Sequence, residues 1–216
     1  MSDILKRLKA QCVNIVEPDG SLRLSLYNSE NMAPAMMDGV NLLPGHREGH
    51  GTSGIMFYNT EGDECGGMGF TSTKLEDGGY VSSLSMTFDK YKNDQVVQVS
   101  LSEQNGVRRY GYTIYDRPDK HLSESVKLRG ILESEEVPQA EKDRLTKEFL
   151  LENAVRMTLG RGTDGSVSAR INDSKGRERI KIELGPDGTP CIAVLDQHGN
   201  ICADIIAQEE GSDFDA

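Results

Sequence analysis

An internal repeat near the C-terminus constrains the fold more than any other feature of this 216-residue sequence. The stretch that begins at Asp164 aligns with the stretch that begins at Asp187, 23 residues further on, and Gly176 aligns in the same way with Gly199. Each unit reads as a turn, an alternating strand, a second turn and a second alternating strand. Repeats of this length are typical of stacked units that bury their apolar surface against their neighbours.

Apolar and polar residues alternate within the repeated strands. Ile180, Ile182 and Leu184 are separated by Lys181 and Glu183. A period of two residues predicts a β-strand with one buried face. Asp and Gly in the intervening turns favour hairpins, because the Asp carboxylate accepts hydrogen bonds from the backbone ahead of it and Gly adopts positive φ without strain.

The same pattern of strand, turn and strand recurs earlier in the sequence, with turn centres near Asn28, Asn59, Asp89 and Asp116. Together the hairpins predict a mainly β protein of about twelve strands, almost all antiparallel because short turns join them. The edges of such a sheet must be closed or covered. A barrel, a propeller-like ring and a stack of hairpins would each meet this condition, and the sequence does not choose among them.

One segment interrupts the hairpins with a helical pattern. Pro138 fits a first-turn position, and Leu145 and Phe149 lie four residues apart on one helix face. We therefore predict an inserted, partly helical arm over 120–152. The rest of the chain up to residue 206 is predicted to form a single β domain, and the acidic residues 207–216 a disordered tail.

The charge balance argues against two kinds of partner. Lys and Arg number 24 against 35 Asp and Glu, which gives a formal net charge of −11. Nucleic acids and anionic membranes bind a surplus of basic residues, so neither is expected. No stretch of the sequence is apolar for long enough to span a bilayer, and the first residues do not resemble a secretory signal. We therefore expect a cytoplasmic protein.

The first half of the chain is the expected place for a pocket. Most of the aromatic residues lie between positions 57 and 115, and they follow an irregular segment, 31–54, that is rich in Gly, Pro and Met. Long irregular loops are often functional, and binding sites typically combine apolar walls with a few polar groups. The alternative is that these hairpins form the best-packed part of the core and that 31–54 is a surface excursion.

Carboxylates near the aromatic residues are the candidate reactive groups. Alternation allows one carboxylate of the turn 61–64 to project inward beside Tyr58, and Asp89 can do the same near Tyr91. Burial against rings raises the pKa of a carboxyl group and makes it a general acid or base. The predicted catalytic residues are Glu61, Glu64 and Asp89, and the predicted ligand-binding residues are Phe57, Tyr58, Asn59, Phe88, Tyr91 and Gln95.

No cofactor motif is present, and no cofactor is predicted. His46 and His50 have the spacing that brings two imidazoles together on a helix, but Pro44 and Gly51 flank them and make a helix unexpected. A metal site at these histidines is the weaker alternative to solvated loop side chains.

Two sequence motifs in the central hairpins, FYNTEGDECGG and FDKYKNDQ, resemble motifs of a group of bacterial β-hairpin-repeat proteins. That group carries phrases of the form F-Y-N-x-E-G-x-E-x-G-G and F-D-x-Y-x-x-D-Q, and the resemblance covers most of 12–118 and 153–206. It implies a shared β architecture and implies no activity. The matching polar positions are Asn59, Glu61, Glu64, Asp89, Tyr91 and Gln95.

Two functions follow from these observations. The first is a protein that binds a small organic molecule, either without catalysis or as a cofactor-free enzyme for isomerisation, cyclisation or hydrolysis by carboxylate and tyrosine acid–base chemistry. The second is a structural or interaction module that self-associates into homo-oligomers. An apolar-lined cavity favours the first hypothesis, and an exposed apolar flank favours the second.

Overall fold

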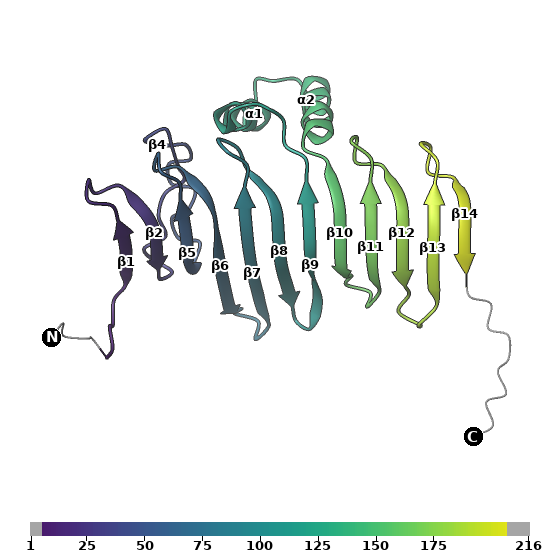
Figure 1. Cartoon of the computed structure of the whole chain (residues 1–216), viewed down its shortest axis with the longest axis horizontal. Coiled ribbons are helices and arrows are strands. Elements are labelled where there is room, and N and C mark those ends of the chain that lie inside the picture. The colour runs from purple at the N-terminus through teal and green to yellow at the C-terminus, as the bar shows by residue number, and fades with distance from the viewer. Residues whose placement is uncertain (1–5, 207–216) are drawn as a thin grey trace.

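The computed structural model describes residues 6–206 and consists of one wide antiparallel sheet with two helices at one end of its strands (Figure 1). The predicted tail, 207–216, lies outside the described residues. The strands and helices, in chain order, are β1 (Cys12–Val16), β2 (Leu22–Tyr27), β3 (Met36–Met37), β4 (Val40–Asn41), β5 (Ser53–Tyr58), β6 (Glu64–Lys74), β7 (Tyr80–Asp89), β8 (Gln95–Gln104), β9 (Val107–Tyr115), α1 (Leu122–Glu133), α2 (Gln139–Glu152), β10 (Val155–Arg161), β11 (Val167–Asn172), β12 (Glu178–Leu184), β13 (Pro190–Leu195) and β14 (Ile201–Ile206).

Twelve of the strands form a single sheet in the order β1-β2-β5-β6-β7-β8-β9-β10-β11-β12-β13-β14. Each strand is antiparallel to its neighbours, so the predicted repeated hairpins are confirmed. The turns predicted near Asn28 and Asp116 are wrong as hairpin turns, because the connection to β5 and the helical arm begin there. The predicted helical arm is also confirmed, because α1 and α2 lie between β9 and β10. The sheet is an open stack of hairpins and does not close, since β1 and β14 are its two edges. Of the three arrangements that the sequence left open, the stack of hairpins is confirmed.

The repeated turns use the chemistry that the sequence predicted. Gly176 and Gly199 have φ of 74° and 86°, and each donates its backbone N–H to the carbonyl of the Asp three residues earlier. The carboxylate of Asp173 accepts hydrogen bonds from two backbone N–H groups ahead of it, and that of Asp196 does the same. Only residues that tolerate positive φ fit here, which explains the 23-residue spacing of these glycines.

The register aligns apolar residues into two ladders that cross the whole sheet. The first ladder begins at Ile15 on β1 and ends at Ala203 on β14; the second begins at Val13 and ends at Ile205. Every position in both ladders is apolar, with Gly66 the one that has no side chain. Residues that face each other across strands lie on the same face, so these two rows make one face apolar from edge to edge, and Arg161 lies on that face in the row next to Leu159.

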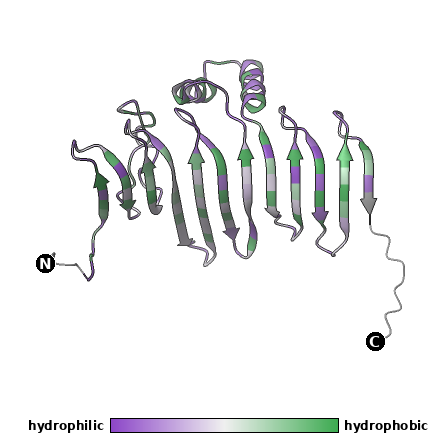
Figure 2. Ribbon diagram, in the orientation of Figure 1, coloured by the Kyte–Doolittle hydropathy of each residue, from purple (hydrophilic) through white to green (hydrophobic). Residues whose placement is uncertain are grey.

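Within 6–206 most of this apolar face is uncovered, although Leu8 and Ala10 of the segment before β1 lie beside Val13 and Leu26 at its β1 end. On β12, Ile182 is 49% exposed, whereas the side chains of its neighbours Lys181 and Glu183 on the opposite face are only 25% and 18% exposed. Figure 2 shows hydrophobic and hydrophilic bands alternating along these strands. The period of two residues correctly predicted two faces, but the expectation that the apolar one is buried is wrong for the single chain.

The opposite face is partly covered by the long connection between β2 and β5. This connection, residues 28–52, packs on a small core in which Tyr27, Met56 and Tyr58 are buried, with Met32 and Met36 against them. It contains the two-stranded β3–β4 hairpin. The irregular segment that the sequence singled out therefore covers the polar face of the sheet beside the helices.

The turn glycines give a direct test of this architecture. Gly188 has φ of 89°, and a Cβ added there would meet no atom within 4 Å. Gly188→Ala should therefore lower the free energy of unfolding by about 1–2 kcal/mol through backbone strain alone. Urea denaturation followed by circular dichroism measures the change. The control is Gly130→Ala in the interior of α1, where space is also open and alanine should stabilise the chain by up to about 1 kcal/mol. Equal effects at both positions would contradict the turn assignment.

Candidate functional site

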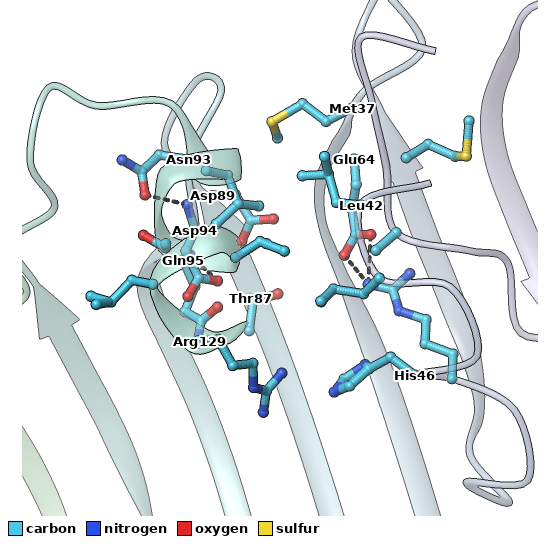
Figure 3. Close-up of a pocket in the computed structure, with 18 of the residues that line it drawn as sticks. Met37, Leu42, His46, Glu64, Thr87, Asp89, Asn93, Asp94, Gln95 and Arg129 are labelled. Carbon is cyan, nitrogen blue, oxygen red and sulfur yellow. Dashed lines mark hydrogen bonds and ion pairs between the residues drawn. The ribbon is translucent and has the colours of Figure 1, made fainter. Parts of the chain in front are cut away.

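A cavity of about 530 Å³ lies at the end of the sheet next to the helices. Segment 28–52 forms one wall, α1 forms another, and the ends of β6 and β7 form the floor (Figure 3). The residues that line it include Met36, Met37, Leu42, Leu43, His46 and Arg47 from segment 28–52; Glu64, Thr87, Asp89, Asn93, Asp94 and Gln95 from the strands and the turn after β7; and Leu122, Val126, Leu128, Arg129, Leu132 and Phe149 from the helices.

The walls are held together by one ammonium group. Lys92 Nζ lies 2.6 Å from Asp63 Oδ2 and 2.7 Å from Glu61 Oε2, and it also pairs with Asp38 Oδ1. Asp63 is only 1% exposed, and it also accepts the backbone N–H of Asp38 at 2.6 Å. These contacts join segment 28–52 to the turns that follow β5 and β7. They also raise the pKa of Lys92, first through the hydrogen bond to Asp38 and then through those to Asp63 and Glu61.

The same cluster reaches the beginning of α1. His121 is the N-cap of this helix and accepts the backbone N–H of Ser123 through Nδ1. Its Nε2 lies 2.8 Å from Asp38 Oδ2. An N-cap side chain fixes the first turn of a helix, so this contact sets the position of α1 relative to segment 28–52. The cluster therefore positions both walls of the cavity, although none of its side chains lines it.

Asp89 is the most perturbed acid of the cavity. Its Oδ1 is buried and has no hydrogen-bond partner among the described residues. Burial, followed by the neighbouring carboxylates of Glu64 and Asp94, raises its pKa from the ordinary 3.8 to about 7. A carboxyl group with this pKa exchanges a proton readily at neutral pH, which is the property required of a general acid or base.

Glu64 lies across from Asp89 and is paired. Arg47 Nη2 donates to Glu64 Oε2 at 2.6 Å and Oε1 at 2.8 Å, and Arg47 Nη1 donates to the carbonyl of Ala33 at 2.9 Å. Burial raises the pKa of Glu64, and the Arg47 guanidinium opposes that rise. Because Arg47 balances this charge, Asp89 is the carboxyl group that has no such partner in the cavity.

The two histidines lie near each other at the rim. The rings of His46 and His50 have centroids 5.4 Å apart, and His46 lines the cavity. Burial lowers the pKa of His46, and the charges of Arg129, His50 and Arg47 lower it further. Within residues 6–206 no third metal-ligating side chain joins them. The one group of three potential ligands in that range is Asp38, Glu61 and Asp63, and Lys92 lies among them.

The structure brings together only some of the residues predicted to form a site. Glu64, Asp89 and Gln95 line the cavity, and Figure 3 shows Glu64 on one side of it and Asp89 and Gln95 on the other. Phe57 and Phe88 lie on the apolar ladder of the opposite face, where Phe88 is 48% exposed. The two phenylalanines therefore cannot contact a molecule held in this cavity.

The remaining predicted residues lie around the turn that follows β5. Glu61 accepts a hydrogen bond from the Tyr91 hydroxyl at 2.9 Å, and Tyr91 is 66% exposed, so both lie outside the cavity. Asn59 accepts the backbone N–H of Glu61 and of Asp63 and shapes the turn. Tyr58 is buried in the small core, and its hydroxyl has no partner among the described residues.

Sequence reasoning missed the helix wall and the arginines. Val126, Leu128 and Leu132 on α1 line the cavity, and Arg47 and Arg129 contribute charge to it. The sequence indicated an arm over 120–152 but gave no sign of where it lies. Arg47 follows His46 in the segment already singled out, so its position beside a histidine was the only available signal.

The chain matches no protein-family model and no curated protein sequence. Among residues 6–206, neither helix is long and apolar enough to cross a membrane.

The raised pKa of Asp89 predicts a pH-dependent stability. The folded chain holds this proton up to about pH 7, whereas an unfolded Asp loses it near 3.8. The free energy of unfolding should therefore fall between about pH 4 and pH 7, and Asp89→Asn should remove that part of the fall. Urea denaturation across this pH range measures it. Glu76→Gln, at an exposed carboxylate outside the cavity, should leave the pH profile unchanged. A profile of Asp89→Asn parallel to the wild type would contradict the assignment.

Loss of Lys92 should loosen the walls of the cavity. Lys92→Met leaves Asp38, Glu61 and Asp63 without their shared ammonium group, and Asp63 remains buried. Backbone amides in 36–43 and at the beginning of α1 should then exchange hydrogen faster, as measured by mass spectrometry. The control, Lys127→Met, removes an exposed lysine of α1 and should not alter exchange in 36–43. Unchanged exchange in both variants would exclude this role for Lys92.

Proposed function

We propose that the cavity binds a small organic molecule and that Asp89 exchanges a proton with it. The observation that carries the proposal is the buried Oδ1 of Asp89, which has no hydrogen-bond partner among the described residues and belongs to a cavity of about 530 Å³. Buried polar groups in proteins are nearly always hydrogen-bonded. A ligand that donates a hydrogen bond to this oxygen would satisfy it.

The lining supports a ligand with an apolar body and one polar group. Leu42 and Leu43 on one wall and Val126 and Leu132 on the other offer apolar contacts. The polar side chains gather near Asp89 at the floor, and among them Glu64 is already paired with Arg47. A volume of this size suits a small organic molecule. A donor such as an amine, hydroxyl or enol would lie against Asp89.

Catalysis in this cavity would consist of proton transfer by Asp89. At neutral pH the carboxyl group is present in both its protonated and its ionised form, so it can either donate or accept a proton. Burial is the main cause of the raised pKa of Asp89; the Glu64 carboxylate raises that pKa further, and the Arg47 guanidinium opposes the rise. This chemistry suits an isomerisation, a cyclisation or a hydrolysis without a cofactor. Of the three carboxylates that the sequence suggested, the proposal keeps Asp89 as the proton-transfer group.

A fragment screen tests the binding. Saturation-transfer NMR with a library of small amines, alcohols and carbonyl compounds should identify fragments that bind the wild-type chain. Val126→Trp should abolish those signals because the indole would fill the cavity from the α1 wall. Ile131→Trp is the matched control, since Ile131 lies on the exposed side of the same helix and should keep the signals. Fragments that bind all three proteins equally would show that the cavity is not the binding site.

Proton exchange is tested separately with an amine fragment from that screen. Calorimetric titration in two buffers of different ionisation enthalpy gives the number of protons released on binding. Because an ammonium ligand favours the ionised form of Asp89, release should approach one proton per ligand somewhat below pH 7 and vanish above it. Asp89→Asn should release none. Equal release from wild type and variant would refute the role of Asp89 while leaving binding intact.

A further inference from the structure

The apolar face of the sheet is a second feature that the chain alone does not account for. The two ladders described above cross all twelve strands, and no ladder position carries a charged residue. Large side chains on this face are exposed along its whole length, from Ile15 at 54% to Leu159 at 47% and Val194 at 43%. A contiguous apolar surface of this extent marks an interaction site.

The two insertions in the sheet lie on the other face, and among the described residues the segment before β1 reaches the apolar face at its β1 end, through Leu8 and Ala10. Segment 28–52 and α1 enclose the cavity with Thr87 and Asp89, which belong to the polar face of β7. The described residues therefore leave most of the apolar face of the twelve strands without a covering layer.

We propose that this face packs against the same face of a second copy of the chain. Two open sheets related by a two-fold axis form a sandwich in which the ladders of one copy contact those of the other. Sheets pack face to face at about 10 Å with side chains interdigitated. The cavity lies on the opposite face, so this inference does not depend on the function proposed for it.

The dimensions of the face support a partner of the same shape. Strands about 4.8 Å apart place twelve of them across about 53 Å, and the alternate positions of a strand cover about 20 Å. The face thus offers on the order of 1,000 Å² per chain, and a standard specific interface buries about 800 Å² per partner. A helix is only about 10 Å wide and would leave most of this width uncovered.

The charge distribution also favours a second copy. The chain carries a net charge of −11, yet the ladders are uncharged, so two copies can meet here without bringing their carboxylates together. On β11 and β12 the charged side chains are paired on the polar face, where Arg170 contacts Glu178 and Glu183 and Lys181 contacts Glu183. An anionic membrane would instead be repelled by the net charge.

Sedimentation velocity over about 1–100 μM tests the proposal. The wild-type chain should sediment as a dimer with twice its mass of 23.7 kDa. Leu84→Arg and Ile182→Arg each place a guanidinium on the apolar face, where it would be buried between the sheets. Each should weaken the dimer by about 100-fold or more. Both residues are exposed in one chain, at 40% and 49%, so the variants should fold as monomers with unchanged circular dichroism.

The matched control is Ser83→Arg, one residue before Leu84 on the same strand but on the polar face and exposed. It should dimerise like the wild type. An assembly that survives both apolar-face variants would indicate pairing through the edge strands β1 and β14 and would overturn the proposal. A wild-type chain that stays monomeric over the whole range would overturn it too. Co-sedimentation of that monomer with phosphatidylcholine vesicles would assign the face to a lipid surface instead.

Discussion

The structure depends on antiparallel hairpin pairing in a single layer. Each of the twelve strands hydrogen-bonds only to its neighbours in sequence order within the sheet, and within residues 6–206 the other sheet is the two-stranded β3–β4 hairpin of segment 28–52. Side chains therefore gain most of their contacts from residues directly opposite on adjacent strands. Strict alternation then sorts the chain into an apolar face and a polar face. The cavity and the uncovered ladders are consequences of that one arrangement.

Two insertions convert part of the polar face into a cavity. Segment 28–52 and the helical arm leave the hairpin stack at different points and meet above β6 and β7. There Lys92 pairs with Asp38 of segment 28–52 and with Asp63 of the turn after β5, and Asp38 also contacts His121 at the beginning of α1. Without them Asp89 would be an ordinary carboxylate on an exposed strand end. Burial beneath the insertions is the first cause of its raised pKa, so the reactivity of the site depends on segments far apart in sequence.

Periodicity predicted local structure well and predicted burial poorly. The spacing of Asp and Gly identified the hairpin turns, and the pattern around Pro138 identified the arm. The aromatic concentration between 57 and 115 suggested a pocket, yet Phe70, Phe88 and Tyr110 lie on the uncovered apolar face. Alternation shows which residues share a face, but what covers that face depends on segments whose path the pattern does not encode.

The sequence by itself determined the approximate number of strands in the main sheet, the turn chemistry and the short list that included Glu64 and Asp89. Tertiary structure decided which carboxylates meet. Gly66 adopts φ of 128°, and the pairing register between β5 and β6 shifts after Phe57. The two-residue alternation of strand side chains, extended from Tyr58, therefore could not show which of Glu61, Asp63 and Glu64 points toward the cavity. A local irregularity changes the parity of every later residue, and only the folded chain reveals it. The open sheet was decided in the same way, because closure depends on how twist accumulates across strands and not on any one hairpin.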